Sequence, residues 1–161
     1  MGVADLGTGV GYFVPEICRR IGPSGSLYLV EPDAESLARA LRRVGSGVDP
    51  VAYRCSAAQA TAIPDSRVDR VLLSLVLCCL RDKTGTMEQA WRILRPGGRA
   101  LITYPRAYGL LRPSKRSFRV TGGVWAALLG HHPWQPVLPP FGRLVRHHLI
   151  EKPTPSTRSP A

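Results

Sequence analysis

Three closely spaced glycines near the amino terminus mark the part of the chain best suited to bind a ligand through its backbone. Gly7, Gly9 and Gly11 follow Val3–Leu6, an apolar stretch typical of a short strand, and precede apolar residues at helical spacing. Glycine lets the chain turn tightly and lets a ligand lie directly against the main chain. The N–H groups at the start of the following helix attract an anion or a carboxylate. The segment therefore predicts a turn that cradles a polar ligand.

Two carboxylates accompany this turn. Asp5 lies just before it and could hold a cation, such as an amino group. Glu31 ends a second apolar run, Ser26–Glu31, twenty residues past Gly11. Ligands of open α/β sheets bind at the carboxyl ends of the strands, where a carboxylate can accept hydrogen bonds from both hydroxyls of a ribose. The pairing predicts a pocket for a ribose-bearing cofactor.

The glycine motif alone does not identify that cofactor. The dinucleotide-binding fingerprint is G-x-G-x-x-G, whereas here the third glycine comes one residue early and position 12 is Tyr12. A plain tight turn in an α/β protein would also explain the glycines. Both interpretations stay open at this point.

Strand and helix patterns alternate along the first two thirds of the chain. The predicted strands are Val3–Leu6, Ser26–Glu31, Val51–Cys55, Val68–Leu77 and Arg99–Tyr104. The predicted helices include Val10–Ile21, a second helix that Asp33 can cap, and Met87–Leu94, which the segment Arg95–Gly98 closes in a sharp turn. A helix between each pair of strands is typical of parallel pairing. The pattern predicts an α/β fold with a doubly wound, mainly parallel sheet.

Several segments together resemble one family. Those segments are Asp5–Gly11, Leu29–Asp33, Ala60–Pro64, Val68–Val71, Leu75–Leu80 and Ala90–Gly98. Their order and spacing over about residues 2–104 resemble class I S-adenosylmethionine-dependent methyltransferases of the type 11 group. The resemblance implies a Rossmann-like fold, S-adenosyl-L-methionine as cofactor, and methyl transfer from its sulfonium to an acceptor.

The resemblance also implies a set of cofactor-binding residues: Asp5, Gly7, Gly9, Gly11, Glu31, Pro32, Asp33, Gln59, Ala60, Ser74 and Leu75. Asp5, Gly7 and Gly9 would line the methionine part of the cofactor, and Gly11 would pack the helix onto the sheet. Glu31 would hold the ribose hydroxyls.

The adenine and the transferring methyl group would lie against the remaining residues of this set. Pro32 or Asp33 would flank the adenine, and Gln59 with Ala60 would lie at its edge. The family usually has an acid where Gln59 stands, so an amide oxygen would accept there without charge assistance. Ser74 and Leu75 would face the methyl group. Ordinary packing or surface polarity is the alternative for each of these residues.

The chain departs from the family at both ends. The family normally has helices before its first strand and ends with a crossing strand and a hairpin, for which 143–151 is the candidate here. We therefore expect a sheet reduced at both ends, with a poorly covered edge. The predicted organisation is a cofactor-binding core at 1–104, a basic, proline-rich extension at 105–151 and a disordered tail at 152–161. A truncated, non-catalytic fragment or binding module is the alternative to an active enzyme.

The positive charge is concentrated in the last third of the chain. Residues 105–161 hold 9 basic and 1 acidic residue, against 13 and 10 in residues 1–104. A solvated tail is the favoured interpretation, and RNA binding or RNA methylation through this tail is a third possibility. No segment is typical of a signal peptide or a membrane span, which predicts a cytoplasmic protein without membrane contact.

We expect neither a catalytic side chain nor a metal site. The sulfonium is already activated, so an ionised acceptor needs no base. The histidines at 131, 132, 147 and 148 are poor candidates for one. The four cysteines have no metal-ligand spacing and are predicted to be reduced packing residues. The expected acceptor is a small molecule, and the sequence predicts no oligomeric state.

Overall fold

The computed structural model describes residues 1–60, 62–105, 120–142 and 145–155. Its elements, in chain order, are β1 (Gly2–Leu6), α1 (Val14–Ile21), β2 (Ser26–Val30), α2 (Ala34–Leu41), β3 (Pro50–Tyr53), the short 3-10 helix η1 (Ala57–Gln59), β4 (Val68–Ser74), α3 (Lys83–Ile93), β5 (Leu94–Pro105), α4 (Gly122–Gly130), β6 (Gln135–Pro136) and β7 (Val145–Glu151).

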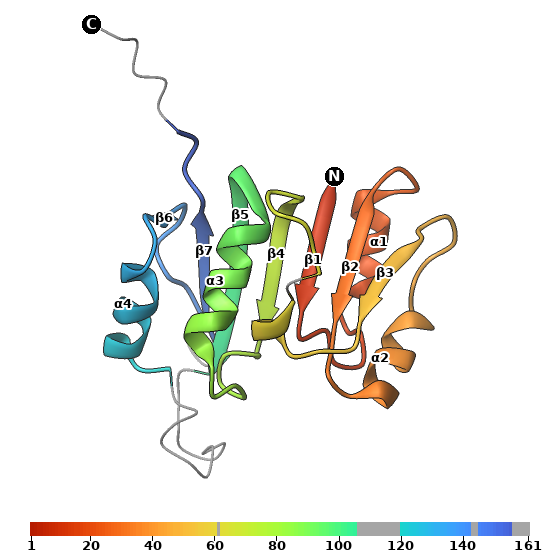
Figure 1. Ribbon diagram of the computed structural model, residues 1–161, viewed down its shortest axis with the longest axis horizontal. Helices are drawn as coiled ribbons and strands as arrows, with labels where there is room; N and C mark the ends of the chain where they lie inside the picture. Colours follow the sequence, from red (N-terminus) through yellow and green to blue (C-terminus); the bar gives the residue numbers. More distant parts are fainter. Residues whose placement is uncertain (61, 106–119, 143–144, 156–161) are drawn as a thin grey trace, which may run out of the picture.

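The strands form one sheet in the order β3-β2-β1-β4-β5-β7-β6 (Figure 1). The five strands from β1 to β5 run parallel, whereas β7 pairs antiparallel with both β5 and β6. The predicted doubly wound, mainly parallel sheet is confirmed. β7 lies within the stretch 143–151 that was the candidate for a late strand, and β6 has no counterpart in the sequence prediction.

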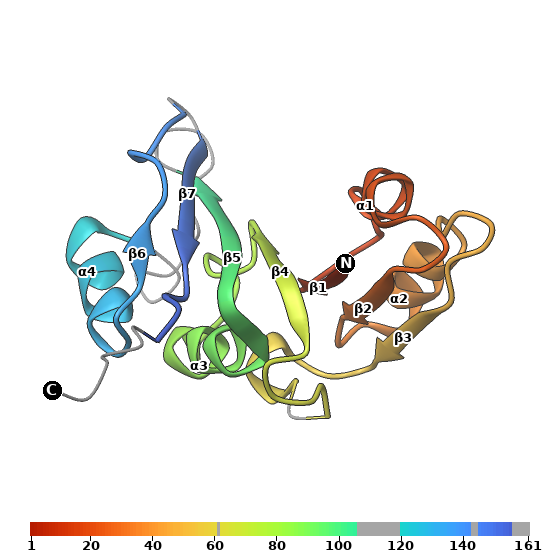
Figure 2. The same cartoon turned by 90° about the horizontal axis from the view of Figure 1, so that it is seen from above.

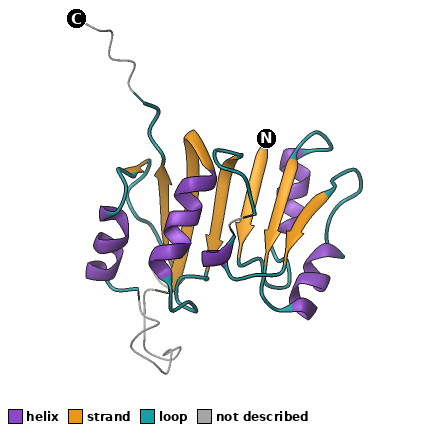
Figure 3. Ribbon diagram, in the orientation of Figure 1, coloured by secondary structure: helices purple, strands orange, loops and turns teal. Residues whose placement is uncertain are grey.

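Helices cover the two faces of the sheet unevenly (Figures 2 and 3). On one face, α1 and α2 pack beside β1 and β2 around Val14, Leu27 and Leu29. On the other face, η1, α3 and α4 pack over a larger core that includes Leu73 and Ile102. Successive side chains of a strand point to opposite faces, so each strand contributes to both layers.

Several predicted elements begin or end elsewhere than expected, and α1 and β4 show why. α1 begins at Val14 rather than Val10, because three glycines with φ of 82°, 53° and 76° hold the preceding residues in turns. β4 ends at Ser74 rather than Leu77, because Leu75 has a φ of 59° and leaves the extended conformation. Both differences concern residues that follow β1 or β4, at the carboxyl ends of these neighbouring parallel strands.

The segment Arg95–Gly98 was predicted to close a helix in a sharp turn, but it lies inside β5. Val68 pairs with Leu94 and Arg70 pairs with Arg99, so β5 has extra residues that bulge between these pairs. Gly97, with a φ of 75°, donates its N–H to the carbonyl of Lys152 at 2.7 Å. The bulge therefore joins α3 directly to β5 and anchors the chain after β7.

The antiparallel end of the sheet has an aromatic cluster. Tyr104 of β5 and Trp125 of α4 both pack against His148 of β7, with ring centroids 5.4 Å and 4.0 Å from the imidazole and 5.8 Å from each other. Tyr104 Oη and His148 Nε2 are 2.9 Å apart. In the described part of the chain, no helix combines the length and the apolar character that crossing a membrane requires.

Candidate functional site

Hydrogen bonds bring the glycine turn against the end of β2. The N–H groups of Gly7 and Thr8 both donate to the carbonyl of Val30, at 2.8 Å and 3.0 Å. Gly11 N–H donates to the carbonyl of Thr8 at 2.9 Å, which closes the turn on itself. The tips of β1 and β2 are therefore adjacent, as a shared ligand site requires.

The Glu31 carboxylate reaches across the gap between these two strand tips. Its Oε2 accepts from Gly9 N–H at 3.0 Å, and its Oε1 accepts from Asp33 N–H at 3.1 Å. A carboxylate has about four acceptor positions, so both oxygens can take further donors. The two backbone bonds hold the carboxylate at the edge of the glycine turn and leave it with acceptor positions for a ligand.

Asp5 is a buried carboxylate beneath the same turn. Only 2% of the residue is exposed, and Thr8 Oγ1 donates to its Oδ2 at 2.8 Å. The pKa of Asp5 is raised to about 6: burial raises it most, the Thr8 hydrogen bond lowers it, and the negative charge of Glu31 adds a smaller rise. A carboxylate that is costly to ionise gains most from a cation placed next to it.

A cavity of about 360 Å³ opens where these groups meet. The residues that line it are Asp5, Gly7, Thr8, Gly9, Val10, Tyr12, Phe13, Ser74 and Leu75. Its volume falls within the range of small-molecule sites. A Cβ added to Gly9 would meet no atom within 4 Å, so the backbone there faces open space that a ligand can fill. The bare main chain and the two carboxylates fit a ligand with a polar, partly cationic chain.

The far wall of the cavity is formed at the end of β4. Leu75 donates its N–H to the carbonyl of Thr103 at 3.0 Å and to Thr103 Oγ1 at 3.2 Å. Ser74 Oγ lies 3.2 Å from the same Thr103 hydroxyl. These bonds hold Leu75 in its left-handed conformation, with 45% of the residue exposed. Thr103 thus supports the wall without lining the cavity.

Six residues of the predicted set line the cavity or border it, and five do not line it. Asp5, Gly7, Gly9, Ser74 and Leu75 line the cavity, and Glu31 lies at its border. Gly11, Pro32, Asp33, Gln59 and Ala60 lie outside its lining. The site that the sequence predicts is therefore brought together at its methionine and ribose ends.

The residues predicted to contact adenine have other roles as well. Asp33 caps α2 by accepting from Ser36 N–H at 2.8 Å, and Gln59 is exposed with its Oε1 3.0 Å from Ser56 Oγ. Ala60 is buried in the core at 1% exposure, so its side chain cannot face a ligand. Pro32 is exposed at the start of the segment that leads into α2.

Sequence reasoning missed four residues of the lining. Thr8 and Val10 lie between the glycines of the motif, and Tyr12 and Phe13 follow it directly. Their closeness to the glycines was the signal that could have predicted them. Tyr12 is 75% exposed, which is high for an aromatic residue. A large ring at the mouth of the cavity can cover a bound ligand.

Neither the histidines nor the cysteines provide a base beside the cavity. Burial lowers the pKa of His148 to about 4, and His132 lies against Glu88 at 2.6 Å on the face covered by α3. Burial also raises the pKa of Cys78 to about 12, with a smaller contribution from Cys79, so Cys78 remains a thiol at neutral pH. Among the described residues, no three His, Cys, Asp or Glu side chains are grouped as metal ligands.

All four cysteines carry free thiols. Cys18 lies on the buried face of α1, as predicted for a packing residue. Cys79 is exposed, so the packing interpretation is wrong for this residue. It follows Leu75, a residue of the cavity lining, by four positions.

The fold and the site together define a class of protein. A glycine turn and an acidic residue at the carboxyl ends of adjacent parallel strands are typical of a Rossmann-like, nucleotide-cofactor-binding domain. A family model described as a methyltransferase domain matches residues 4–102, which is more than half of the chain. The chain belongs to this family, the type 11 group of class I S-adenosylmethionine-dependent methyltransferases.

Curated relatives and solved structures agree with this assignment. The ubiquinone/menaquinone biosynthesis C-methyltransferase UbiE of Pasteurella multocida is 36% identical over 104 residues, which cover 62% of this chain and 38% of that protein. UbiE of Cronobacter sakazakii is 30% identical over 146 residues, covering 89% of this chain and 53% of that protein. The chain thus spans about half or less of the length of these relatives.

A solved SAM-dependent methyltransferase from Aquifex aeolicus has the same fold. It superposes with a TM-score of 0.77 at 17% identity, over 94% of this chain and 82% of that chain. This similarity supports the fold.

Replacement by alanine is expected to destabilise the protein much more at Gly11 than at Gly9. A Cβ at Gly11, where φ is 76°, would lie 2.6 Å from Ala40 Cα. We expect Gly11→Ala to lower the free energy of unfolding by about 3 kcal/mol, through overpacking and left-handed strain. Gly9→Ala meets no neighbouring atom and should cost only about 1 kcal/mol.

Cofactor affinity should be affected directly by the substitution at Gly9, although that substitution costs little stability. The Gly9→Ala methyl group would take space in the open cavity, so affinity for S-adenosylhomocysteine should fall clearly although the protein stays folded. Urea unfolding and calorimetric titration of both variants measure the two effects. A Gly9→Ala variant that binds like the wild type would show that the ligand does not lie against this part of the turn.

Proposed function

We propose that this chain binds S-adenosyl-L-methionine in the cavity at the ends of β1 and β4 and transfers its methyl group to a small-molecule acceptor. The observation that supports this most is the position of Glu31, whose carboxylate spans the tips of β1 and β2 beside an open glycine turn. This arrangement fits a ribose that lies across both tips.

The other groups of the site fit the rest of the cofactor. Asp5 would pair with its α-ammonium group, and the backbone at Gly7 and Gly9 would lie along its methionine chain. Pro32 and Asp33 stand beyond Glu31, on the side where the adenine would extend. Gln59 is exposed and can turn toward the adenine edge, whereas Ala60 can contribute only through its backbone.

The chemistry of the step needs alignment more than it needs a base. When bound, the cofactor supplies an activated methyl group on a sulfonium. The acceptor would donate an electron pair to form the new bond to carbon, and the carbon–sulfur bond would break with its pair left on sulfur. An ionised thiol or hydroxyl acceptor has already lost its proton, so no side chain must take one. A carbon acceptor would release its proton to solvent after the transfer. Ser74 and Leu75 would hold the acceptor in line and exclude water.

A small-molecule acceptor is favoured over a nucleic acid. The UbiE relatives are named for C-methylation in ubiquinone and menaquinone biosynthesis. The basic residues that suggested RNA binding lie in residues 105–161, and many of them fall in 106–119 or 156–161, outside the described residues. Location in the cytoplasm and the division at residue 104 remain predictions of the sequence.

Titration calorimetry with S-adenosylhomocysteine tests the proposal directly. We expect saturable binding with one site per chain, and transfer of label from methyl-labelled cofactor to a quinol or thiol acceptor in a substrate screen. Absence of binding at millimolar ligand would contradict the proposal and favour the non-catalytic alternative. Binding without transfer to any acceptor would support a cofactor-binding module only.

A further inference from the structure

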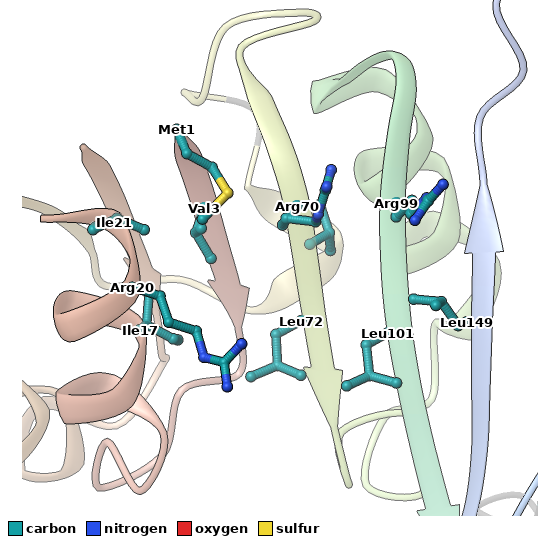
Figure 4. Close-up of a pocket in the computed structure, with 11 residues that line it drawn as sticks. Met1, Val3, Ile17, Arg20, Ile21, Arg70, Leu72, Arg99, Leu101 and Leu149 are labelled. Carbon is teal, nitrogen blue, oxygen red and sulfur yellow. The ribbon is translucent and has the colours of Figure 1, made fainter. Parts of the chain in front are cut away.

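A cavity of about 460 Å³ lies on the sheet face that carries α1, away from the candidate cofactor site (Figure 4). Apolar side chains such as Val3, Leu72 and Leu101 line it together with arginines. Among the described residues of this lining, none is a histidine, a cysteine or a carboxylate. Side chains that can bond a metal or a metalloid lie elsewhere, and two of them are adjacent just beyond the end of β4.

Cys78 and Cys79 form a pair of thiols beside the cofactor cavity. Their Sγ atoms are 3.8 Å apart, and both thiols are free. Both thiols donate to one acceptor, the carbonyl of Leu75, with Sγ···O distances of 3.1 Å for Cys78 and 3.5 Å for Cys79. Leu75 itself lines the cofactor cavity. The shared acceptor therefore holds the two sulfurs on the same side of the turn, as a preformed dithiol.

The distance between the two sulfurs limits what can bridge them. A disulfide needs an S–S distance of about 2.05 Å, so this pair is not one. With thiolate bonds of about 2.3 Å, sulfurs on opposite sides of a linear centre lie about 4.6 Å apart, and sulfurs at a tetrahedral angle lie about 3.8 Å apart. The observed 3.8 Å fits one bent centre bonded to both sulfurs.

The number of available ligands selects among bent centres. A zinc site in a protein uses three or four side chains, and among the described residues no third histidine, cysteine or carboxylate joins the pair. Trivalent arsenic is pyramidal and bonds sulfur strongly. When it already carries one organic group, it needs only two more bonds. A trivalent organoarsenical is therefore satisfied by these two thiols alone.

The surroundings of the pair favour a product without charge. Burial raises the pKa of Cys78, and the neighbouring Cys79 adds to the rise, so two thiolates side by side are costly. Two arsenic–sulfur bonds replace both S–H groups and leave no charge behind. The Lys83 ammonium group, which donates to the carbonyl of Leu80 at 2.6 Å, opposes the rise in the pKa of Cys78 and so helps the first thiol to lose its proton.

We propose that Cys78 and Cys79 together bind a trivalent organoarsenical. With a compound of the form R–As=O, two arsenic–sulfur bonds form and the arsenic–oxygen bond breaks. Both thiol protons leave with the oxygen as water. Arsenic stays trivalent, so the reaction needs neither an oxidant nor a reductant. The site uses neither the glycine turn nor Glu31, so it does not rest on the proposed function.

Titration of the reduced 161-residue chain with phenylarsine oxide, followed by intact mass and by thiol counting, tests this proposal. We expect one phenylarsenic group per chain and the loss of two of the four reactive thiols. Cys78→Ser and Cys79→Ser should each weaken binding at least about 100-fold, because a single thiol lacks the high effective concentration of its neighbour. Cys55→Ser, the matched control, removes a partly buried thiol and should bind like the wild type.

Two further measurements separate the folded site from general thiol reactivity. A dithiol such as dimercaptopropanol should release the arsenical, whereas mercaptoethanol at the same thiol concentration should not. A peptide of residues 74–83 contains the same two cysteines but must order both side chains on binding. It should bind about tenfold more weakly than the folded chain. Cys79 is exposed, so Cys79→Ser should fold, with unchanged circular dichroism.

Three results would overturn the proposal. The first is no saturable uptake of phenylarsine oxide by the reduced chain. The second is uptake that survives both Cys78→Ser and Cys79→Ser, which would place the arsenical on another cysteine. The third is equal affinity of the peptide and the folded chain, which would show that the fold does not form the site. Normal uptake by a chain that fails to bind S-adenosylhomocysteine would contradict the proposed function while supporting this proposal.

Discussion

Replacing Glu31 by alanine is expected to weaken binding of S-adenosylhomocysteine by about 100-fold. The carboxylate is held by Gly9 N–H and Asp33 N–H at the tips of two strands, where it would accept from both ribose hydroxyls. Two charge-assisted hydrogen bonds are worth about 3 kcal/mol together, which corresponds to this loss of affinity. Titration calorimetry measures it.

Two control variants make this result specific. Glu31→Gln keeps an acceptor but loses the charge, so an intermediate loss of about tenfold is expected. Glu35→Ala removes an exposed carboxylate in the first turn of α2, which pairs with Arg39, and should leave affinity unchanged. If Glu31→Ala binds within about twofold of the wild type, the ribose does not lie on this carboxylate.

Replacing Asp5 by asparagine is expected to stabilise the protein while it weakens cofactor binding. The asparagine side chain would keep the shape and could still accept from Thr8, but it removes a buried charge. The folded pKa of about 6 lies above the ordinary value of 3.8. Between these values the folded state binds the proton and the unfolded state does not, so stability falls as pH rises from about 4 to about 6.

The gain in stability should therefore depend on pH. Near pH 7 the wild type has the full cost of the ionised carboxylate, so the asparagine variant should gain roughly 2 to 3 kcal/mol. Near pH 4 the two proteins should be similar. Urea unfolding at the two pH values measures this. A destabilised variant near pH 7 would show that Asp5 already has a compensating partner in the free protein.

Cofactor affinity should change in the opposite direction at this residue. The α-ammonium group of the ligand pairs only with the ionised form of Asp5, so wild-type affinity should fall about tenfold between about pH 7 and about pH 5. The asparagine variant should bind weakly at both pH values. The ionised Asp5 would thus lower the stability of the free protein and strengthen cofactor binding, a trade-off between stability and function that is common in binding sites.

Local patterns in the sequence were sufficient for the core of the fold. The glycine turn, the apolar strands and the carboxylate at Glu31 each depend on residues within a few positions, so their types predict their conformations. Asp33 was expected to cap the second helix, and the bond from Ser36 N–H confirms it. The ends of β1 and β2 therefore followed from short segments alone.

The features that the sequence did not reveal depend on distant contacts. Leu75 ends β4 because Thr103, 28 residues later, binds its N–H group. The bulge at Arg95–Gly98 extends β5 because Gly97 bonds to Lys152. Ala60 is taken into the core rather than toward a ligand. None of these contacts can be predicted from the few residues next to it in the sequence.

The aromatic cluster at the antiparallel end of the sheet makes the stability of the fold depend on pH in mild acid. Burial against Tyr104 and Trp125 lowers the pKa of His148 to about 4, whereas an unfolded histidine takes a proton near pH 6.5. Stability from this ring therefore declines as the solution is acidified through that interval, just where the buried aspartate adds to it. The two titrations offset each other. If cofactor binding weakens in mild acid, the cause would therefore be protonation of the site, because the protein itself stays folded.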